Sequence, residues 1–244
     1  PKLMKILLKV VIILSTAFVS VNGQDSGGPS EPSRGVFPAF DLGGKLVKIP
    51  APANFAETMS RYPQIAGRLI ASESPLNDVL AAHIDAATLP MLKDGGEPDI
   101  PYYTKVSVPK HLRSADVSLA DFRALAAELK RQPPLALQAT LKKDESEADA
   151  RLSGFWGMAA NMKVGETRTI GHFNEQDRVI SSLFVTNSEA FGRRFAIIGS
   201  MSLVLVNDRL IFLYVFRTTT DPRDQEDVIG LTKSWTARTI EANR

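Results

Sequence analysis

The segment that decides the fold is residues 195–217, FAIIGSMSLVLVNDRLIFLYVFR. Its two runs, residues 195–206 and 209–217, are rich in Val, Ile, Leu and Phe, which is typical of buried strands. Asn207 and Asp208 lie between the runs and tolerate the positive φ angles that a two-residue hairpin turn requires. The segment therefore predicts a long β-hairpin in the structural heart of the protein.

The residues after the hairpin predict a closing helix. Asp221 can accept hydrogen bonds from the free amides of a helix start, and Pro222 fits the first helical position. The apolar face of this helix, which we expect to lie on the sheet, consists of Val228, Leu231, Trp235 and Ile240.

Further strands precede the hairpin. Residues 167–173 and 178–186 read as two strands joined by the polar turn 174–177. Residues 79–84 form another predicted strand. In the strand predicted at 102–108, the period of two places Tyr103, Lys105 and Ser107 on one side and Tyr102, Thr104, Val106 and Val108 on the other.

Nearer the N-terminus, residues 36–50 read as a first strand that Pro50 and Pro52 close. Within it, Gly43-Gly44-Lys45 lacks the preceding glycine of a phosphate loop and is typical of a turn. Residues 55–74 fit either a short helix or irregular cover of the sheet.

Two helices are predicted in the middle of the chain. Ser118 and Asp121 resemble a capping box, and the apolar residues after them recur every three or four positions through Leu129. Pro133 and Pro134 end that helix. A second helix would continue to residue 152 with residues 142–149 facing solvent, and Gly154 would stop it.

Strands and helices are grouped along the chain instead of alternating. This order favours an α+β fold, a mostly antiparallel sheet flanked by helices, over a doubly wound parallel sheet. We expect residues 36–244 to form a single domain of this class.

The pattern resembles the PsbP/Mog1-like family of α/β/α sandwiches. The residues that carry the resemblance are Ile49-Pro50-Ala51-Pro52 at the end of the first strand, the hairpin 195–217 and the closing helix with Trp235. The resemblance implies a shared fold. It implies no catalytic residues, because the family has none in common, and a shared fold does not fix a function.

The first 23 residues predict export. Lys2, Lys5 and Lys9 give a basic start, and residues 10–21 form a short apolar run that ends before Gly23. This order is typical of a secretory signal peptide, and a run of a dozen residues is too short to span a bilayer, which takes about 20. We expect cleavage near Gly23 and Gln24, a disordered linker at 24–35, no transmembrane segment in the mature protein, and a periplasmic or secreted location.

Composition narrows the function classes further. The chain has 29 basic and 27 acidic residues, and removal of residues 1–23 leaves 26 and 27, a net charge of −1. A basic footprint for nucleic acid is therefore not expected. The absence of cysteine excludes disulfides, thiol catalysis and thiolate metal sites.

No motif points to catalysis or to a cofactor. His83, His111 and His172 lack metal-ligand spacing, and His83 reads as a hydrogen-bonded core residue. Ser200 lies in Gly199-Ser200-Met201-Ser202, which is not a nucleophile elbow. We expect none of these four residues to be a catalytic centre and Ser200 to lie in the sheet. We also expect no serine hydroxyl or paired carboxylates to converge on His172 at the floor of a cleft.

These observations favour an exported, non-catalytic domain that binds a partner protein, a small apolar ligand or an envelope component. The alternative is a periplasmic hydrolase whose site is scattered in the sequence. Peripheral membrane association is disfavoured, because no basic amphipathic helix is present. Phe155, Trp156, Met158 and Met162 could form a soft binding patch, although such residues pack in cores more often.

Overall fold

The computed structural model describes residues 37–71, 73–93, 100–131, 150, 163–190, 193–219 and 221–244. Several predictions fall outside these residues: the signal peptide 1–23, the linker 24–35, nearly all of the second middle helix with Gly154, and the patch of Phe155, Trp156, Met158 and Met162.

The helices and strands follow one another in the order predicted for an α+β chain. They are β1 (Ala39–Asp41), β2 (Leu46–Lys48), β3 (Phe55–Glu57), α2 (Pro63–Ala71), β4 (Asn77–Asp85), η1 (Ala86–Thr88), α3 (Leu89–Lys93), β5 (Tyr102–Pro109), η2 (Lys110–Leu112), α4 (Leu119–Arg131), β6 (Lys163–Gln176), β7 (Val179–Ala190), β8 (Arg193–Val206), β9 (Arg209–Thr218) and α6 (Asp224–Ala242).

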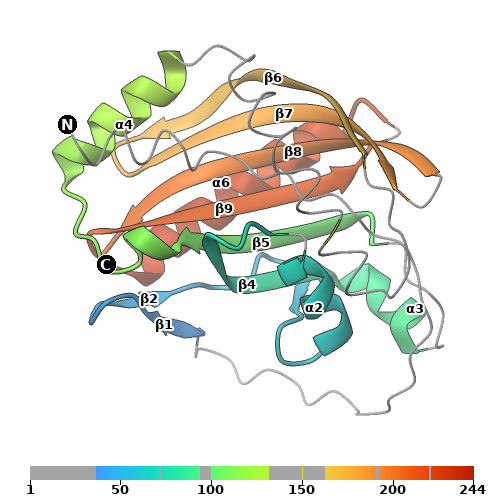
Figure 1. Ribbon diagram of the computed structural model, residues 1–244, viewed down its shortest axis with the longest axis horizontal. Helices are drawn as coiled ribbons and strands as arrows, with labels where there is room; N and C mark the ends of the chain where they lie inside the picture. The colour runs from blue at the N-terminus through green and yellow to red at the C-terminus, as the bar shows by residue number, and fades with distance from the viewer. Residues whose placement is uncertain are drawn as a thin grey trace.

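A seven-stranded sheet organises the molecule, with the strand order β3-β4-β5-β9-β8-β7-β6 (Figure 1). Every neighbouring pair in it is antiparallel, which confirms the predicted fold class. The hairpin β8–β9 lies in the middle of the sheet, and its turn residues Asn207 and Asp208 have φ angles of 47° and 55°, as the sequence predicted.

The prediction of one first strand over residues 36–50 is wrong. This segment forms the separate two-stranded hairpin β1–β2, which turns at Gly43 and Gly44. Both glycines have positive φ angles, and a Cβ on Gly43 would lie 2.4 Å from the Cβ of Ser114. A backbone that folds back at two glycines cannot continue as one strand.

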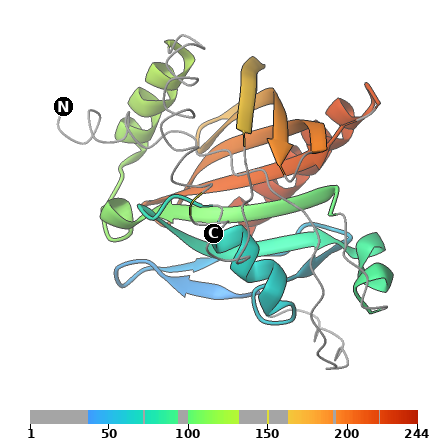
Figure 2. The ribbon, with the colours of Figure 1, turned by 45° about the vertical axis from the view of Figure 1, so that its right-hand side comes forward.

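Helices cover both faces of the sheet, and the small hairpin β1–β2 lies on the same face as α6. On one face, α6 packs with β1–β2 against a core that includes Val106, Ile211 and Val228. On the other face, α2 and α4 pack against a core that includes Phe184, Met201 and Phe216. Figures 1 and 2 show α2 in front of the sheet and α6 behind it.

The closing helix α6 differs in detail from its prediction. It begins at Asp224, and Val228 and Trp235 are fully buried as predicted, whereas Leu231 and Ile240 are half-buried. Three threonines that the apolar pattern did not identify, at positions 232, 236 and 239, are buried as well. Each donates its hydroxyl to a carbonyl four residues earlier, so no hydroxyl is left without a partner.

The other local predictions meet mixed outcomes. The capping box of α4 is confirmed, because Asp121 N donates to Ser118 Oγ and Ser118 N donates to Asp121 Oδ2. The open segment 55–74 resolves into β3 and α2. The polar turn predicted at 174–177 is shifted, since β6 continues to Gln176 with an irregular register at its end.

Candidate functional site

The most unusual chemistry of the fold lies beside the C-terminal end of α2. Lys105 occupies the middle of β5, where it pairs with Ala82 of β4 and Tyr214 of β9. Because side chains alternate along a strand, Lys105 points with Tyr103 and Ser107 toward the face that α2 covers. Its side chain is 1% exposed, which is exceptional for a lysine.

Glu73 neutralises this buried lysine. It lies in the turn after α2, and its Oε2 is 2.6 Å from Lys105 Nζ, with both side chains at most 2% exposed. The other carboxylate oxygen accepts hydrogen bonds from Ser74 N at 3.0 Å and from Asn77 Nδ2 at 2.9 Å. An ion pair so deeply buried gains little net stability, since both charges lose their hydration.

Two aromatic rings lie under the ammonium group. Lys105 Nζ is 5.3 Å from the ring centroid of Tyr214 and 5.8 Å from that of Phe216, within the range of a cation–π contact. Burial raises the pKa of the Tyr214 phenol, and the negative charge of Glu73 raises it further against a smaller opposing effect of Ser107. The phenol therefore remains protonated at neutral pH.

Buried oxygens in this region lack hydrogen-bond partners. Asn77 Oδ1 and Ser107 Oγ meet no partner with hydrogen-bond geometry, and Glu73 Oε2 has the ion pair alone. Such atoms are rare in folded proteins because desolvation without a partner costs about 1–3 kcal/mol each. We call Glu73, Asn77, Lys105, Ser107 and Tyr214 the Lys105 cluster.

The backbone is irregular at the same place. The register of β4 against β5 shifts between Val79 and Ala81, so one residue of β4 bulges. Asn77 and Val79 precede this shift and pair with Pro109 and Ser107. A bulge re-aims the side chains around it, and here it lies beside the unpartnered oxygens.

The histidines and the serine singled out from the sequence do not meet in one site. His83 is buried in the core, where its Nδ1 lies 3.0 Å from Thr104 Oγ1 and its ring meets the edge of Trp235. Burial lowers the pKa of His83 to about 4. His111 is exposed in η2, and Ser200 is buried in β8, 2.6 Å from Thr232 Oγ1. The core position of His83 and the sheet position of Ser200 are confirmed.

His172 has a serine partner, although the serine is buried in the sheet and not at the floor of a cleft. Its Nδ1 lies 2.9 Å from the Ser182 hydroxyl, because β6 and β7 place the two residues opposite each other. Burial lowers the pKa of His172, an effect that Glu175 opposes and Lys130 supports. Glu175 is itself paired with Lys130, and Ser182 is 5% exposed. The pair therefore lacks an exposed nucleophile.

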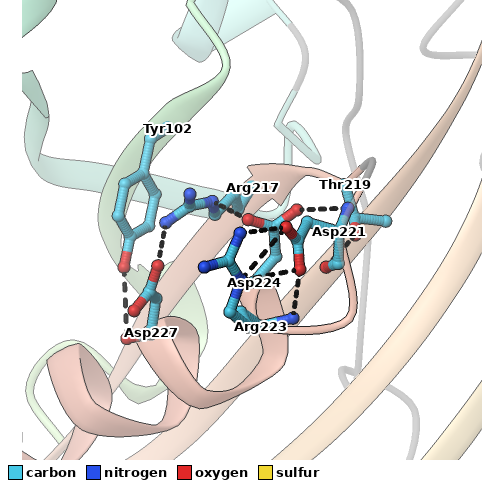
Figure 3. Close-up of polar contacts among 7 residues, drawn as sticks. All are labelled: Tyr102, Arg217, Thr219, Asp221, Arg223, Asp224 and Asp227. Carbon is cyan, nitrogen blue, oxygen red and sulfur yellow. Dashed lines mark hydrogen bonds and ion pairs between the residues drawn. The ribbon is translucent and has the colours of Figure 1, made fainter.

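A second polar network fixes the start of α6 (Figure 3). Arg217 Nε is 2.8 Å from Asp224, its Nη1 is 2.6 Å from Asp227, and the guanidinium stacks on Tyr102 at 4.9 Å. Asp221 accepts from Arg223 N and donates its own N–H to Asp224. These contacts tie the first turn of α6 to the end of β9, and Asp221 accepts a hydrogen bond from the backbone N–H of Arg223 just before the helix begins at Asp224.

No pattern in the sequence pointed to Glu73. The period of two was a partial signal for Lys105, since it placed this lysine on the side of Tyr103 in a strand with apolar neighbours. A charge at an inward position of a buried strand indicates a buried partner, but the partner cannot be named before the fold is known.

Among the described residues, no group of His, Asp and Glu is arranged to hold a metal ion. No helix in the same part of the chain is long and apolar enough to cross a membrane.

Comparison with known proteins gives a resemblance at the level of fold. No family model and no curated protein match the sequence. The Ran-binding protein Mog1p of Saccharomyces cerevisiae is 10% identical, with a TM-score of 0.30 over 85% of this chain and 92% of that chain. A point mutant of Mog1 is also 10% identical, with a TM-score of 0.32 over 85% of this chain and 93% of that chain. This is the weak resemblance to the Mog1/PsbP fold that the sequence predicted, and it carries no functional argument.

Proposed function

We propose that this chain is an exported, non-catalytic binding domain whose ligand site is the Lys105 cluster. The observation that supports the proposal is that two buried oxygens beside the ion pair, Asn77 Oδ1 and Ser107 Oγ, have no partner with hydrogen-bond geometry among the described residues. A ligand that donates or bridges to them would recover the desolvation cost that the unliganded fold carries.

Binding fits the cluster better than catalysis does. Lys105 and Glu73 are paired at 2.6 Å, so neither is free to act as nucleophile or general base. The Tyr214 phenol is held protonated by burial. Charge, hydrogen-bonding atoms and ring faces are fixed in place, which is what recognition requires.

Binding is tested with Ser107→Ala. Because the variant removes a hydroxyl whose contact with the Tyr214 phenol lacks hydrogen-bond geometry, we expect the protein to stay folded and its free energy of unfolding to change by less than about 1 kcal/mol. Titration of the parent with benzoate, benzamide, benzylamine and cyclohexanol, followed by ¹H–¹⁵N NMR, should move the resonances of Lys105, Ser107 and Tyr214 for at least one probe. That probe should bind Ser107→Ala more weakly. If no probe moves these resonances, the ligand site is elsewhere or absent.

The hydrolase alternative rests on the contact of His172 with Ser182. A fluorophosphonate reagent should leave Ser182 unlabelled, and Ser182→Ala should not change the rate of p-nitrophenyl acetate cleavage. Specific labelling of Ser182, lost in His172→Ala, would replace the binding proposal with an esterase.

Export is supported by the basic, apolar and small-residue pattern of residues 1–23. Intact mass of the mature protein from the expressing cell should show an N-terminus near Gln24. A soluble cytoplasmic form that retains residues 1–20 would contradict export and leave the binding proposal to be judged by the NMR titration.

A further inference from the structure

The β1–β2 hairpin is attached to the rest of the domain much as a peptide ligand is bound. Among the described residues it forms a sheet of its own and pairs with no strand of the seven-stranded sheet (Figure 1). Side chains hold its backbone instead. Arg209 Nε donates to Leu42 O at 2.5 Å and Arg209 Nη2 donates to Gly43 O at 3.0 Å. Arg113 Nη2 donates to Asp41 O at 3.1 Å.

The second strand of the hairpin is held in the same manner. Asn243, which follows α6, accepts a hydrogen bond from Lys48 N and donates one to Lys48 O, both at 2.8 Å. Asn207, in the turn between β8 and β9, donates to Leu46 O at 2.7 Å. These contacts bind the main chain of the hairpin and leave its exposed side chains free.

Apolar side chains complete the attachment. Leu42, Val47 and Ile49 are fully buried in the core that α6 covers. Beside them, Trp235 Nε1 donates to Pro50 O at 2.7 Å. The residues that receive the hairpin, which we call the hairpin-binding surface, are Arg113, Asn207, Arg209, Trp235 and Asn243.

The two guanidinium groups of this surface are oriented by the rest of the domain. Arg209 is 3% exposed and pairs with Asp116 at 2.5 Å. Arg113 pairs with Asp78 at 2.7 Å. Neither orientation depends on a side chain of the hairpin, so the surface offers the same donors to any copy of the hairpin that reaches it.

Residues 50–54 alone connect the hairpin to β3. Pro50 and Pro52 favour an extended backbone in the residues before them. The chain then turns at Asn54, whose φ angle of 64° is one that only glycine adopts without cost. A short hinge that is strained in the closed arrangement favours exchange of the attached element between copies of a chain.

The contacts between the hairpin and its surface also span most of the chain. The hydrogen bonds made by Asn207, Trp235 and Asn243 join residues that are 161 to 195 positions apart. Contacts that close such long loops form late in folding. Until they form, the hairpin-binding surface of a second copy competes for the same hairpin.

We propose that the hairpin-binding surface accepts the β1–β2 hairpin of a second copy of this chain, so that two chains exchange hairpins reciprocally with residues 50–54 as the hinge. The exchanged dimer keeps every hairpin contact of the monomer. The balance between the two forms therefore depends on the hinge and on the protein concentration. The inference is independent of the Lys105 cluster.

The first test changes the hinge at Asn54. A short linker gives the chain's own hairpin an effective concentration on the order of millimolar, so the parent should form dimer only after refolding at high protein concentration. Asn54→Pro excludes the closed turn, because proline fixes φ near −65°. By light scattering after size-exclusion chromatography, this variant should dimerise with a dissociation constant at least tenfold below that of the parent. Asn54→Gly, which relieves the strain, should dimerise less than the parent.

The second test identifies which copy supplies the hairpin. The chain contains no cysteine, so single cysteines can be introduced as reporters. Lys45 Nζ of the hairpin lies 2.8 Å from Asp208 Oδ2 of the β8–β9 turn. Lys45→Cys chains refolded together with Asp208→Cys chains should give, with a short bis-maleimide, a covalent product that contains one chain of each kind. Glu226→Cys, in the first turn of α6 and far from the hairpin, replaces Asp208→Cys as the control and should give none.

A folded Asn54→Pro protein that stays monomeric would overturn the inference. A dimer that gives no mixed covalent product would also overturn it, because such a dimer would use another surface. If Asn54→Pro does not fold, the cysteine chains with the parent hinge, refolded together at high concentration, decide the question, and absence of the mixed product there overturns the exchange.

Discussion

Replacement of Trp235 by alanine should be the most destabilising single change on the face of the sheet that α6 covers. Trp235 is 1% exposed, its Nε1 donates to the carbonyl of Pro50 at 2.7 Å, and its ring meets His83 edge to face at 5.8 Å. Truncation of a buried Trp costs about 3–5 kcal/mol, and the orphaned carbonyl adds about 1 kcal/mol. We expect a loss of about 4–6 kcal/mol and a fall in the melting temperature of roughly 8–24 °C for a chain of this size.

Urea denaturation followed by far-UV circular dichroism measures this loss directly. Trp235→Phe keeps most of the ring but loses the N–H donor, so it should cost about 1–2 kcal/mol. Lys233→Ala, at an exposed position of the same helix, should stay within about 0.5 kcal/mol of the parent. A Trp235→Ala protein that unfolds at the same urea concentration as the parent would refute the packing of α6 on the sheet.

Two other predictions follow from the same core. Burial lowers the pKa of His83 from 6.5 to about 4, so on acidification the unfolded chain binds a proton before the folded protein does. The stability that neutral His83 contributes is therefore complete above pH 6.5 and is lost as the pH falls toward 4, by about 2–3 kcal/mol at pH 4.5. His83→Gln should lose less stability between pH 7 and 4.5 in urea titrations, and an unchanged pH dependence would contradict the assignment. A Cβ on Gly199 would lie 2.4 Å from Phe184 Cζ, so Gly199→Ala should lower the free energy of unfolding by about 1–3 kcal/mol. Gly230→Ala, in open space on α6, should raise the free energy of unfolding by about 1 kcal/mol. Thermal melts that show a destabilised Gly230→Ala or an unchanged Gly199→Ala would contradict this geometry.

Local patterns in the sequence predicted the elements that depend on neighbouring residues. The capping box of Ser118 and Asp121 and the turn at Asn207 and Asp208 occur where they were expected. The prediction of a single strand over residues 36–50 was wrong. It treated Gly43 and Gly44 as a turn but did not take into account that the chain reverses there and pairs β1 with β2. The threonines of α6 were missed because an apolar pattern does not register hydroxyls that bond their own helix.

The candidate site shows a different limit. The alternation in β5 gave the side on which Lys105 points, but Glu73 lies 32 positions earlier in a segment that the sequence left open between helix and irregular cover. Ser182 and His172 were likewise brought together by the pairing of β6 with β7. Register between strands, which no local pattern specifies, decides such contacts.

The sequence by itself determined the α+β class, the central hairpin and the burial of Trp235, because periodicity and turn chemistry act over a few residues. The tertiary structure alone decided that Lys105 meets Glu73, that Asn77 Oδ1 is buried without a hydrogen-bond partner, and that Arg217 pairs with Asp224 and Asp227 at the start of α6. Each of these depends on which distant segments the sheet and helices bring within hydrogen-bonding distance, and burial then makes the pairing of every polar group energetically decisive.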